Sequence, residues 1–131
     1  MKIAIPTETQ VGESRVAASP DTVKAYLKKG AEVWVQSGAG KGASITDDAF
    51  AAAGARIVPG GFGDADIVLT VRRPSQELLS SMKRGAILMG GLEPYGDKAG
   101  LEAIANAGVT AFAMELMPRI TRAQAMDILS S

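Results

Sequence analysis

The chain has 131 residues, which suits one domain that buries roughly two-thirds of the surface its unfolded chain exposes. Its 14 basic and 14 acidic residues cancel and form no long run of one charge, so neither a nucleic acid nor an anionic membrane is an expected partner. Cysteine and histidine are both absent, which excludes disulfides, thiolate catalysis, zinc–sulfur sites and the commonest general acid–base side chain. No metal site is predicted. No apolar run approaches the ~20 residues of a membrane span, so direct membrane insertion is not expected either.

Short apolar runs alternate with segments that carry helix-capping signals. Ser19-Pro20-Asp21, for example, provides a hydroxyl cap, a proline at the first helical position and an acid in the first turn, and Gly30 ends that helix. In chain order the predicted elements are a strand at 2–5, a loop at 7–18, a helix at 20–29, a strand at 32–36, a glycine-rich loop at 37–43, a helix at 46–53, a strand at 55–58, a loop at 59–63, a strand at 66–71, a helix at 75–82, a strand at 86–89, a helix at 97–107 and a strand at 110–115.

The predicted strands are continuously apolar rather than alternating, which is typical of a parallel sheet buried on both faces. With right-handed crossovers, this pattern predicts an α/β, flavodoxin-like, doubly wound and mainly parallel sheet with helices on both faces. The pattern leaves the order of the strands open. Residues 1–131 are expected to form a single domain without internal repeats.

The motif Gly38-Ala-Gly-Lys-Gly-Ala43 partly matches the G-x-G-x-x-A fingerprint of dinucleotide-binding loops. However, it follows the second strand rather than the first, and its helix begins only near Thr46. The next strand ends in Val58-Pro59 instead of a ribose-binding acid. We therefore interpret the motif as a structural turn.

Two groups of arginines could bind an anion. Arg15 lies shortly after the first strand, beside the apolar residues 16–18, which favours a position at a cleft; the alternative is that it pairs with Glu8 or Glu13 to hold its loop. Arg72 and Arg73 precede Pro74 and could clamp an anion through their forked donors, or simply end a strand in solvent.

The last nineteen residues, 113–131, carry the strongest functional signal. Pro118 stops strand pairing, and Thr121 with Gln124 forms a capping box, so a helix is predicted from about Arg122. A polar stripe then runs along this helix, just beyond the carboxyl end of a strand, where open α/β sheets bind ligands. The alternative is that these side chains only cap the helix and face solvent. The residues of the stripe are Gln124, Asp127, Ser130 and Ser131.

Three front motifs together resemble the N-terminal lobe shared by alanine dehydrogenases and nicotinamide nucleotide transhydrogenases: Ile3-Ala-Ile-Pro-Thr-Glu-Thr9, Gly12-Glu-Ser-Arg-Val-Ala-Ala18 and Gly38-Ala-Gly40. The closing motif, Met114-Glu-Leu-Met-Pro-Arg-Ile-Thr-Arg-Ala-Gln-Ala-Met-Asp-Ile-Leu-Ser-Ser131, closely resembles the alpha subunit of proton-translocating NAD(P) transhydrogenases, in the segment that precedes the dinucleotide-binding lobe.

The resemblance implies that Arg119, Gln124, Asp127 and Ser130 contact NAD(H) across an interlobe cleft. In the family, the Asp and Ser positions hold the nicotinamide carboxamide, and the Gln position lies between the two nicotinamide rings. Gln124 and Asp127 are therefore the expected catalytic residues. Alanine dehydrogenases instead use a Lys and a His at positions where this chain has Arg72 and Glu93, and Arg15 occupies their pyruvate-binding Arg position.

Direct hydride transfer between two nicotinamides needs orientation of the rings but no proton donor, which is compatible with a lobe without histidine. The resemblance implies NAD(H) as cofactor, with NADP(H) bound by a separate component. It also implies a Rossmann lobe, absent from this chain, a membrane domain and a homodimer in the full enzyme, located peripherally on the cytoplasmic side of the inner or plasma membrane. The lobe alone is expected to be inactive. The alternatives are an alanine dehydrogenase lobe and a non-catalytic flavodoxin-like interaction or oligomerisation module.

Overall fold

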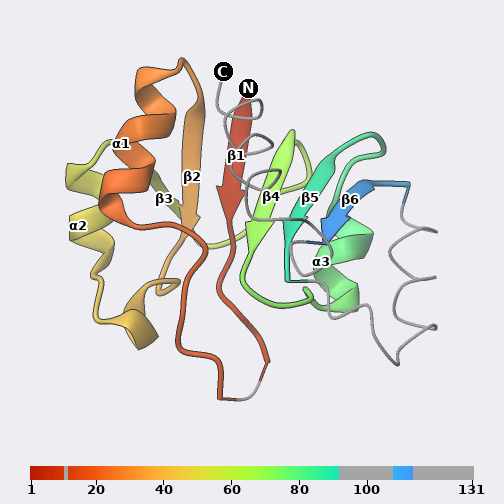
Figure 1. The fold of residues 1–131 in the computed structure, drawn as a ribbon, viewed down its shortest axis with the longest axis horizontal. Coiled ribbons are helices and arrows are strands. Elements are labelled where there is room, and N and C mark those ends of the chain that lie inside the picture. Colours follow the sequence, from red (N-terminus) through yellow and green to blue (C-terminus); the bar gives the residue numbers. More distant parts are fainter. Residues whose placement is uncertain (11, 92–107, 114–131) are drawn as a thin grey trace.

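The computed structural model describes residues 1–10, 12–91 and 108–113. Their elements lie close to the predicted ones, with strands up to two residues shorter and a short 3-10 turn, η1, in the glycine-rich loop (Figure 1). The helix predicted at 97–107 and the one predicted from Arg122 lie outside the described residues. In chain order the elements are β1 (Lys2–Ile5), α1 (Pro20–Lys28), β2 (Glu32–Gln36), η1 (Lys41–Ala43), α2 (Asp47–Ala52), β3 (Arg56–Val58), β4 (Ile67–Thr70), α3 (Gln76–Ser81), β5 (Ile87–Gly90) and β6 (Thr110–Ala113).

Each described α-helix begins after the capping residue that the sequence indicated. The hydroxyls of Ser19, Thr46 and Ser75 accept hydrogen bonds from the backbone N–H groups three residues later, which satisfies donors that have no partner inside a helix. Gly30 follows α1 with φ of 90°, a left-handed conformation that only glycine adopts at little cost.

The six strands form one sheet in the order β3-β2-β1-β4-β5-β6, and all neighbouring strands in it are parallel. This is the strand order of dinucleotide-binding folds. Without the short edge strand β3, the remaining five strands follow the flavodoxin order of 2-1-3-4-5. The predicted doubly wound, parallel α/β class is therefore confirmed, and the structure supplies the strand order that the sequence left open.

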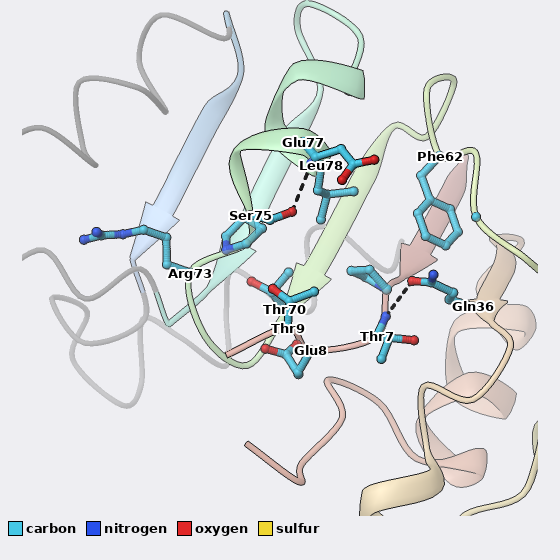
Figure 2. A pocket seen from close by; sticks show the side chains of 13 residues that line it. Thr7, Glu8, Thr9, Gln36, Phe62, Thr70, Arg73, Ser75, Glu77 and Leu78 are labelled. Carbon is cyan, nitrogen blue, oxygen red and sulfur yellow. Dashed lines mark hydrogen bonds between the residues drawn. The ribbon is translucent and has the colours of Figure 1, made fainter. Parts of the chain in front are cut away.

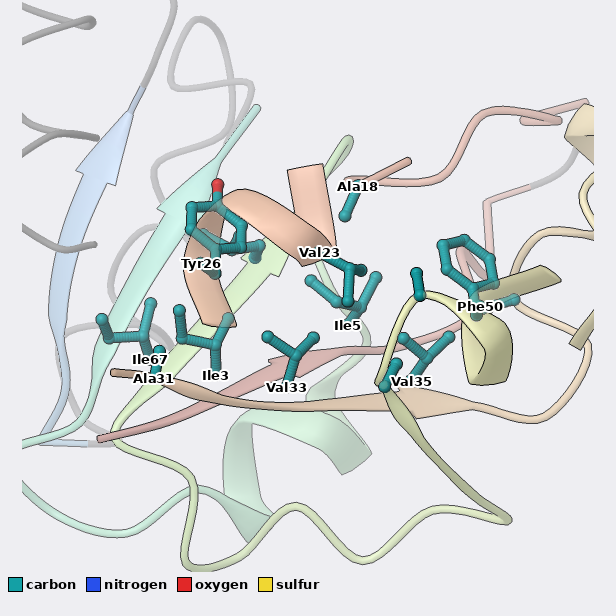
Figure 3. Close-up of a cluster of buried hydrophobic side chains, with 14 of the residues drawn as sticks. Ile3, Ile5, Ala18, Val23, Tyr26, Ala31, Val33, Val35, Phe50 and Ile67 are labelled. Carbon is teal, nitrogen blue, oxygen red and sulfur yellow. The ribbon is translucent and has the colours of Figure 1, made fainter. Parts of the chain in front are cut away.

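Alternate strand residues point to opposite faces of the sheet, and each face has its own buried cluster. On one face, Figure 3 shows Val33 beneath Val23 of α1 and Val35 beneath Phe50 of α2, with Ile3 in the same cluster. On the other face, Val68 and Leu88 of the sheet pack with Leu79 of α3. The described helices thus cover both faces, as the continuously apolar strands predicted.

The connection from β3 to β4, residues 59–66, crosses to the other half of the sheet without a helix. Its buried residues Phe62 (3% exposed) and Ala65 (1% exposed) supply apolar cover for the sheet instead. Phe62 also lines a cavity that opens at the carboxyl edge of the sheet beside this connection.

Candidate functional site

The strand order places a topological switch point between β1 and β4. After β1 the chain turns to the α1 face, whereas after β4 it turns to the α3 face. The two strands pair through Ile3 with Ile67 and Ala4 with Val68, and the chain leaves their carboxyl ends toward opposite faces of the sheet. Ligands of open α/β sheets bind in the crevice at such a switch point.

A cavity of about 220 Å³ lies at this crevice on the α3 face (Figure 2). Apolar walls come from Phe62, Leu78 and the two prolines that flank the strand ends, Pro6 and Pro74. Figure 2 shows Phe62 on one side of the cavity, with Ser75 and Leu78 across from it. Polar groups complete the lining: Thr7, Glu8, Thr9, Gln36, Thr70, Arg73, Ser75 and Glu77.

Side-chain-to-backbone hydrogen bonds tie the rim of this cavity together. The Glu8 carboxylate accepts the backbone N–H groups of Val71 and Arg72, both at 2.9 Å, and so joins the loop after β1 to the end of β4. The Gln36 amide oxygen accepts the N–H of Thr7 at 2.8 Å, and its nitrogen donates to the Pro59 carbonyl at 3.3 Å. The loops around the cavity are therefore held by partners distant in sequence.

A second cavity, of about 330 Å³, opens at the same edge on the α1 face and is lined by Arg15, Ala17, Leu69, Met89 and Gly90 among others. The Arg15 guanidinium, 70% exposed, donates two hydrogen bonds of 2.8 Å to the Glu13 carboxylate, which is only 4% exposed. These bonds, together with the Arg15 backbone N–H, lower the pKa of Glu13 from 4.5 to about 2. Of the two partners proposed from the sequence, Arg15 thus pairs with Glu13, and it also lies at a cavity.

The glycine-rich loop is a structural turn, as interpreted from the sequence. A Cβ at Gly40 would come within 2.7 Å of the Phe50 ring, and one at Gly42 within 2.9 Å of the Ser14 carbonyl oxygen. The Asp47 carboxylate accepts hydrogen bonds from the Gly38 N–H at 2.9 Å and the Ser37 hydroxyl at 2.8 Å, and these bonds lower its pKa. Residues of the protein itself thus fill the space around these glycines and accept the Gly38 N–H. Gly42 lies against the loop that carries Arg15.

The predicted nicotinamide-binding residues Arg119, Gln124, Asp127 and Ser130 lie outside the described residues, as do Glu93 and Ser131. The described part ends at Ala113 of β6, whose parallel pairing with β5 puts its carboxyl end at the same edge as both cavities. Neither Thr70 nor Gln36 stands out in the sequence, because each is an ordinary polar residue at the end of a strand. Only the meeting of several strand ends makes them part of a site.

The described residues contain no group of three acidic, histidine or cysteine side chains arranged to hold a metal ion. In the same residues, no helix is both long and apolar enough to cross a bilayer.

Comparison with known proteins gives consistent matches. The model of the family "Alanine dehydrogenase/PNT, N-terminal domain" matches residues 4–131. The first part of the NAD(P) transhydrogenase alpha subunit of Rhodospirillum rubrum is 50% identical over 139 residues, covering 100% of this chain and 36% of the relative. The alanine dehydrogenase of Mycobacterium tuberculosis is 38% identical over 118 residues, covering 88% of this chain and 32% of the relative.

Solved structures agree. The crystal structure of a transhydrogenase from Sinorhizobium meliloti superposes with a TM-score of 0.88 at 44% identity, over 98% of this chain and 39% of that one. An L-alanine dehydrogenase superposes with a TM-score of 0.81 at 29% identity, over 86% of this chain and 32% of that one. The chain thus spans between 32% and 39% of the length of these four proteins.

Proposed function

The chain belongs to the family of alanine dehydrogenase/PNT N-terminal domains, and on that premise we propose that it is the first lobe of the NAD(H)-binding component of a proton-translocating NAD(P) transhydrogenase. The observation that carries this proposal is the 50% identity to a transhydrogenase alpha subunit over the whole chain. The alanine dehydrogenase match is lower, at 38%, and covers 88% of the chain.

In this proposal, Arg119, Gln124, Asp127 and Ser130 face the nicotinamide of NAD(H), which is held mainly by a separate Rossmann lobe. A carboxamide offers two N–H donors and one acceptor, so a carboxylate and a hydroxyl are suitable partners for it. Asp127 and Ser130 would fix the ring by these bonds, and Gln124 would separate it from the second ring. The lobe's contribution is orientation, which is the main requirement of hydride transfer between two rings.

The proposed reaction is hydride transfer from NADH to NADP⁺, coupled to proton translocation by other domains. Its proposed partners are the Rossmann lobe, an NADP(H)-binding component, a membrane domain and a second copy of the NAD(H)-binding component. The lobe would lie on the cytoplasmic side, peripheral to the membrane. The absence of histidine from the sequence supports this chemistry, since hydride transfer between nicotinamides needs no general acid.

Asp127→Asn in a full-length protein with both lobes tests the proposal. Loss of one charge-assisted hydrogen bond to the carboxamide is expected to slow single-turnover hydride transfer about 10- to 100-fold, with an unchanged unfolding curve. Asp48→Asn is the matched control, because Asp48 is an exposed residue of α2 without a proposed role. An unchanged single-turnover rate for Asp127→Asn would refute the assignment.

A second test uses the 131-residue chain alone. Since it would contribute only part of the cofactor site, we expect weak or undetectable NADH binding in calorimetry. Tight stoichiometric binding would mean that the chain holds a complete site.

The second candidate is a lobe of an alanine dehydrogenase, favoured by the position of Arg15 at the cavity on the α1 face. This candidate predicts alanine-dependent reduction of NAD⁺ by the full-length protein. The transhydrogenase proposal predicts none, and the same preparation assayed with both substrate pairs separates the two.

A further inference from the structure

The cavity at the switch point on the α3 face contains a buried polar group without a partner. Thr70, at the carboxyl end of β4, is 6% exposed, and its hydroxyl makes no hydrogen bond within the described part of the chain. An unpartnered buried polar atom costs about 1–3 kcal/mol and is rare in native proteins, so its position at a cavity wall points to a group that the cavity receives. In the view of Figure 2, Thr70 overlaps Thr9 and lies below Ser75; Thr70 lines this cavity and also the second cavity, on the α1 face.

The neighbouring strand leaves room for this hydroxyl only because Gly90 lies beside it. A Cβ on Gly90 would overlap the Thr70 carbonyl oxygen and stand 2.5 Å from the Thr70 hydroxyl oxygen. Gly90 is the register partner of Thr70 in the β4–β5 ladder, so the packing is fixed by backbone pairing. The hydroxyl oxygen thus lies beside Gly90 at the strand end.

The size of the cavity limits what it can hold. Its volume of about 220 Å³ lies below the range of about 300–1,000 Å³ that is usual for drug-sized ligands. Phe62, 3% exposed, provides an aromatic wall, and Leu78 lies across from it. These walls suit a single planar ring with one small substituent.

The charges of the lining disfavour an anion. Two carboxylates, Glu8 and Glu77, line the cavity, and Arg73 is the one basic residue among its described lining residues. The Arg73 guanidinium extends away from Phe62 and Thr7 in Figure 2. Each Glu8 oxygen already accepts one backbone N–H, yet a carboxylate oxygen has capacity for a second donor. The polar end of a bound molecule should therefore donate hydrogen bonds and carry no negative charge.

We propose that this cavity is a binding site for a small ring compound without negative charge, whose amide or hydroxyl substituent pairs with the Thr70 hydroxyl while its ring lies between Phe62 and Leu78. The site goes beyond the proposed function, since none of its residues belongs to segment 119–130.

The test uses benzamide and benzoate, which have nearly the same shape but differ in charge. The isotope-labelled 131-residue chain is titrated with each compound and followed by amide NMR signals. A molecule of about nine non-hydrogen atoms, at about 0.3–0.45 kcal/mol per atom, has a Kd on the order of 1–10 mM. Benzamide is expected to shift the signals of Thr7, Thr70 and Ser75, with benzoate binding at least about tenfold more weakly.

Thr70→Val removes the hydroxyl and keeps the branched shape. We expect it to weaken benzamide binding about five- to tenfold, with an unfolding midpoint equal to or above that of the wild type, because the hydroxyl has no partner in the described part of the free protein. Thr110→Val, on an exposed residue of β6, is the matched control and should bind as the wild type does.

Three outcomes would each overturn the proposal: equal binding of benzoate and benzamide, no benzamide-induced shift at the cavity, or unchanged binding by Thr70→Val. Because the test involves neither NADH nor any substitution in residues 119–130, its failure leaves the transhydrogenase proposal standing.

Discussion

Glu8→Gln should destabilise the protein strongly, although it changes one atom type in a loop side chain. The Glu8 carboxylate accepts two backbone N–H groups at 2.9 Å, from Val71 and Arg72. A glutamine keeps one acceptor oxygen but turns an NH₂ group toward the other N–H. The partly buried backbone N–H that faces this NH₂ group is then left without an acceptor, which lowers the free energy of unfolding by about 1–3 kcal/mol. The remaining bond loses its charge assistance, which removes about 1 kcal/mol more.

We therefore expect Glu8→Gln to lower the free energy of unfolding by about 2–4 kcal/mol, a large part of the 5–15 kcal/mol typical of a domain. Urea unfolding can be followed through the fluorescence of Trp34, the single tryptophan, whose ring centroid lies 3.1 Å from the Lys2 ammonium nitrogen. If the slope of the unfolding free energy against urea concentration is the same in both proteins, the difference between wild type and Glu8→Gln arises from stability and not from a more compact unfolded state.

The matched control is Glu32→Gln, since Glu32 is an exposed residue of β2 and should change stability by less than about 0.5 kcal/mol. Hydrogen exchange adds a local measurement: the amide protons of Val71 and Arg72 should exchange faster in Glu8→Gln. A loss of stability no larger than that of the control, with unchanged exchange at both amides, would refute the bridging role of Glu8.

Three further predictions follow from single contacts. Gly42→Ala places a Cβ within 2.9 Å of the Ser14 carbonyl oxygen, so we expect a loss of about 1–3 kcal/mol and shifted NMR signals in the loop of Arg15; unchanged signals there would contradict the contact. The folded-state pKa of Glu13 is depressed to about 2, so the ionised Glu13 side chain stabilises the fold above about pH 4.5, and this stabilisation is lost as the pH falls toward 2. The difference in unfolding free energy between wild type and Glu13→Gln should therefore shrink over that window. A difference that does not depend on pH would exclude the pairing with Arg15. Phe50→Ala, at a fully buried side chain, should cost about 3–5 kcal/mol in urea unfolding, and a cost below about 1 kcal/mol would mean that the core is packed differently.

The sequence by itself determined the elements and the fold class. Helix starts at Ser19, Thr46 and Ser75 could be predicted because a capping hydroxyl bonds to a backbone group three residues away, an interaction that is wholly local. The glycine-rich loop could be assigned to a turn because the fingerprint it resembles requires a position in the chain that this loop does not have. Continuous apolar strands likewise predicted burial on both faces, since a solvated face would need polar residues at every second position.

Only the tertiary structure decided the strand order and, with it, the site. The crevice exists because β1 and β4, which are separated in the chain by two other strands and two α-helices, become neighbours whose following segments lie on opposite faces of the sheet. No local signal in either strand specifies a partner so distant in the chain, because every buried parallel strand offers the same backbone donors and acceptors.

The same reason explains which side chains escaped prediction. Glu8, Gln36 and Thr70 are ordinary polar residues in the sequence, and their roles depend on backbone groups or cavities contributed by distant segments. Two acidic residues near Arg15 in the sequence were candidate partners for it. Arg15 pairs with Glu13, whereas the Glu8 carboxylate accepts hydrogen bonds at the end of β4. Local chemistry fixes where helices and strands begin, whereas the site arises from non-local pairing, which only the folded chain decides.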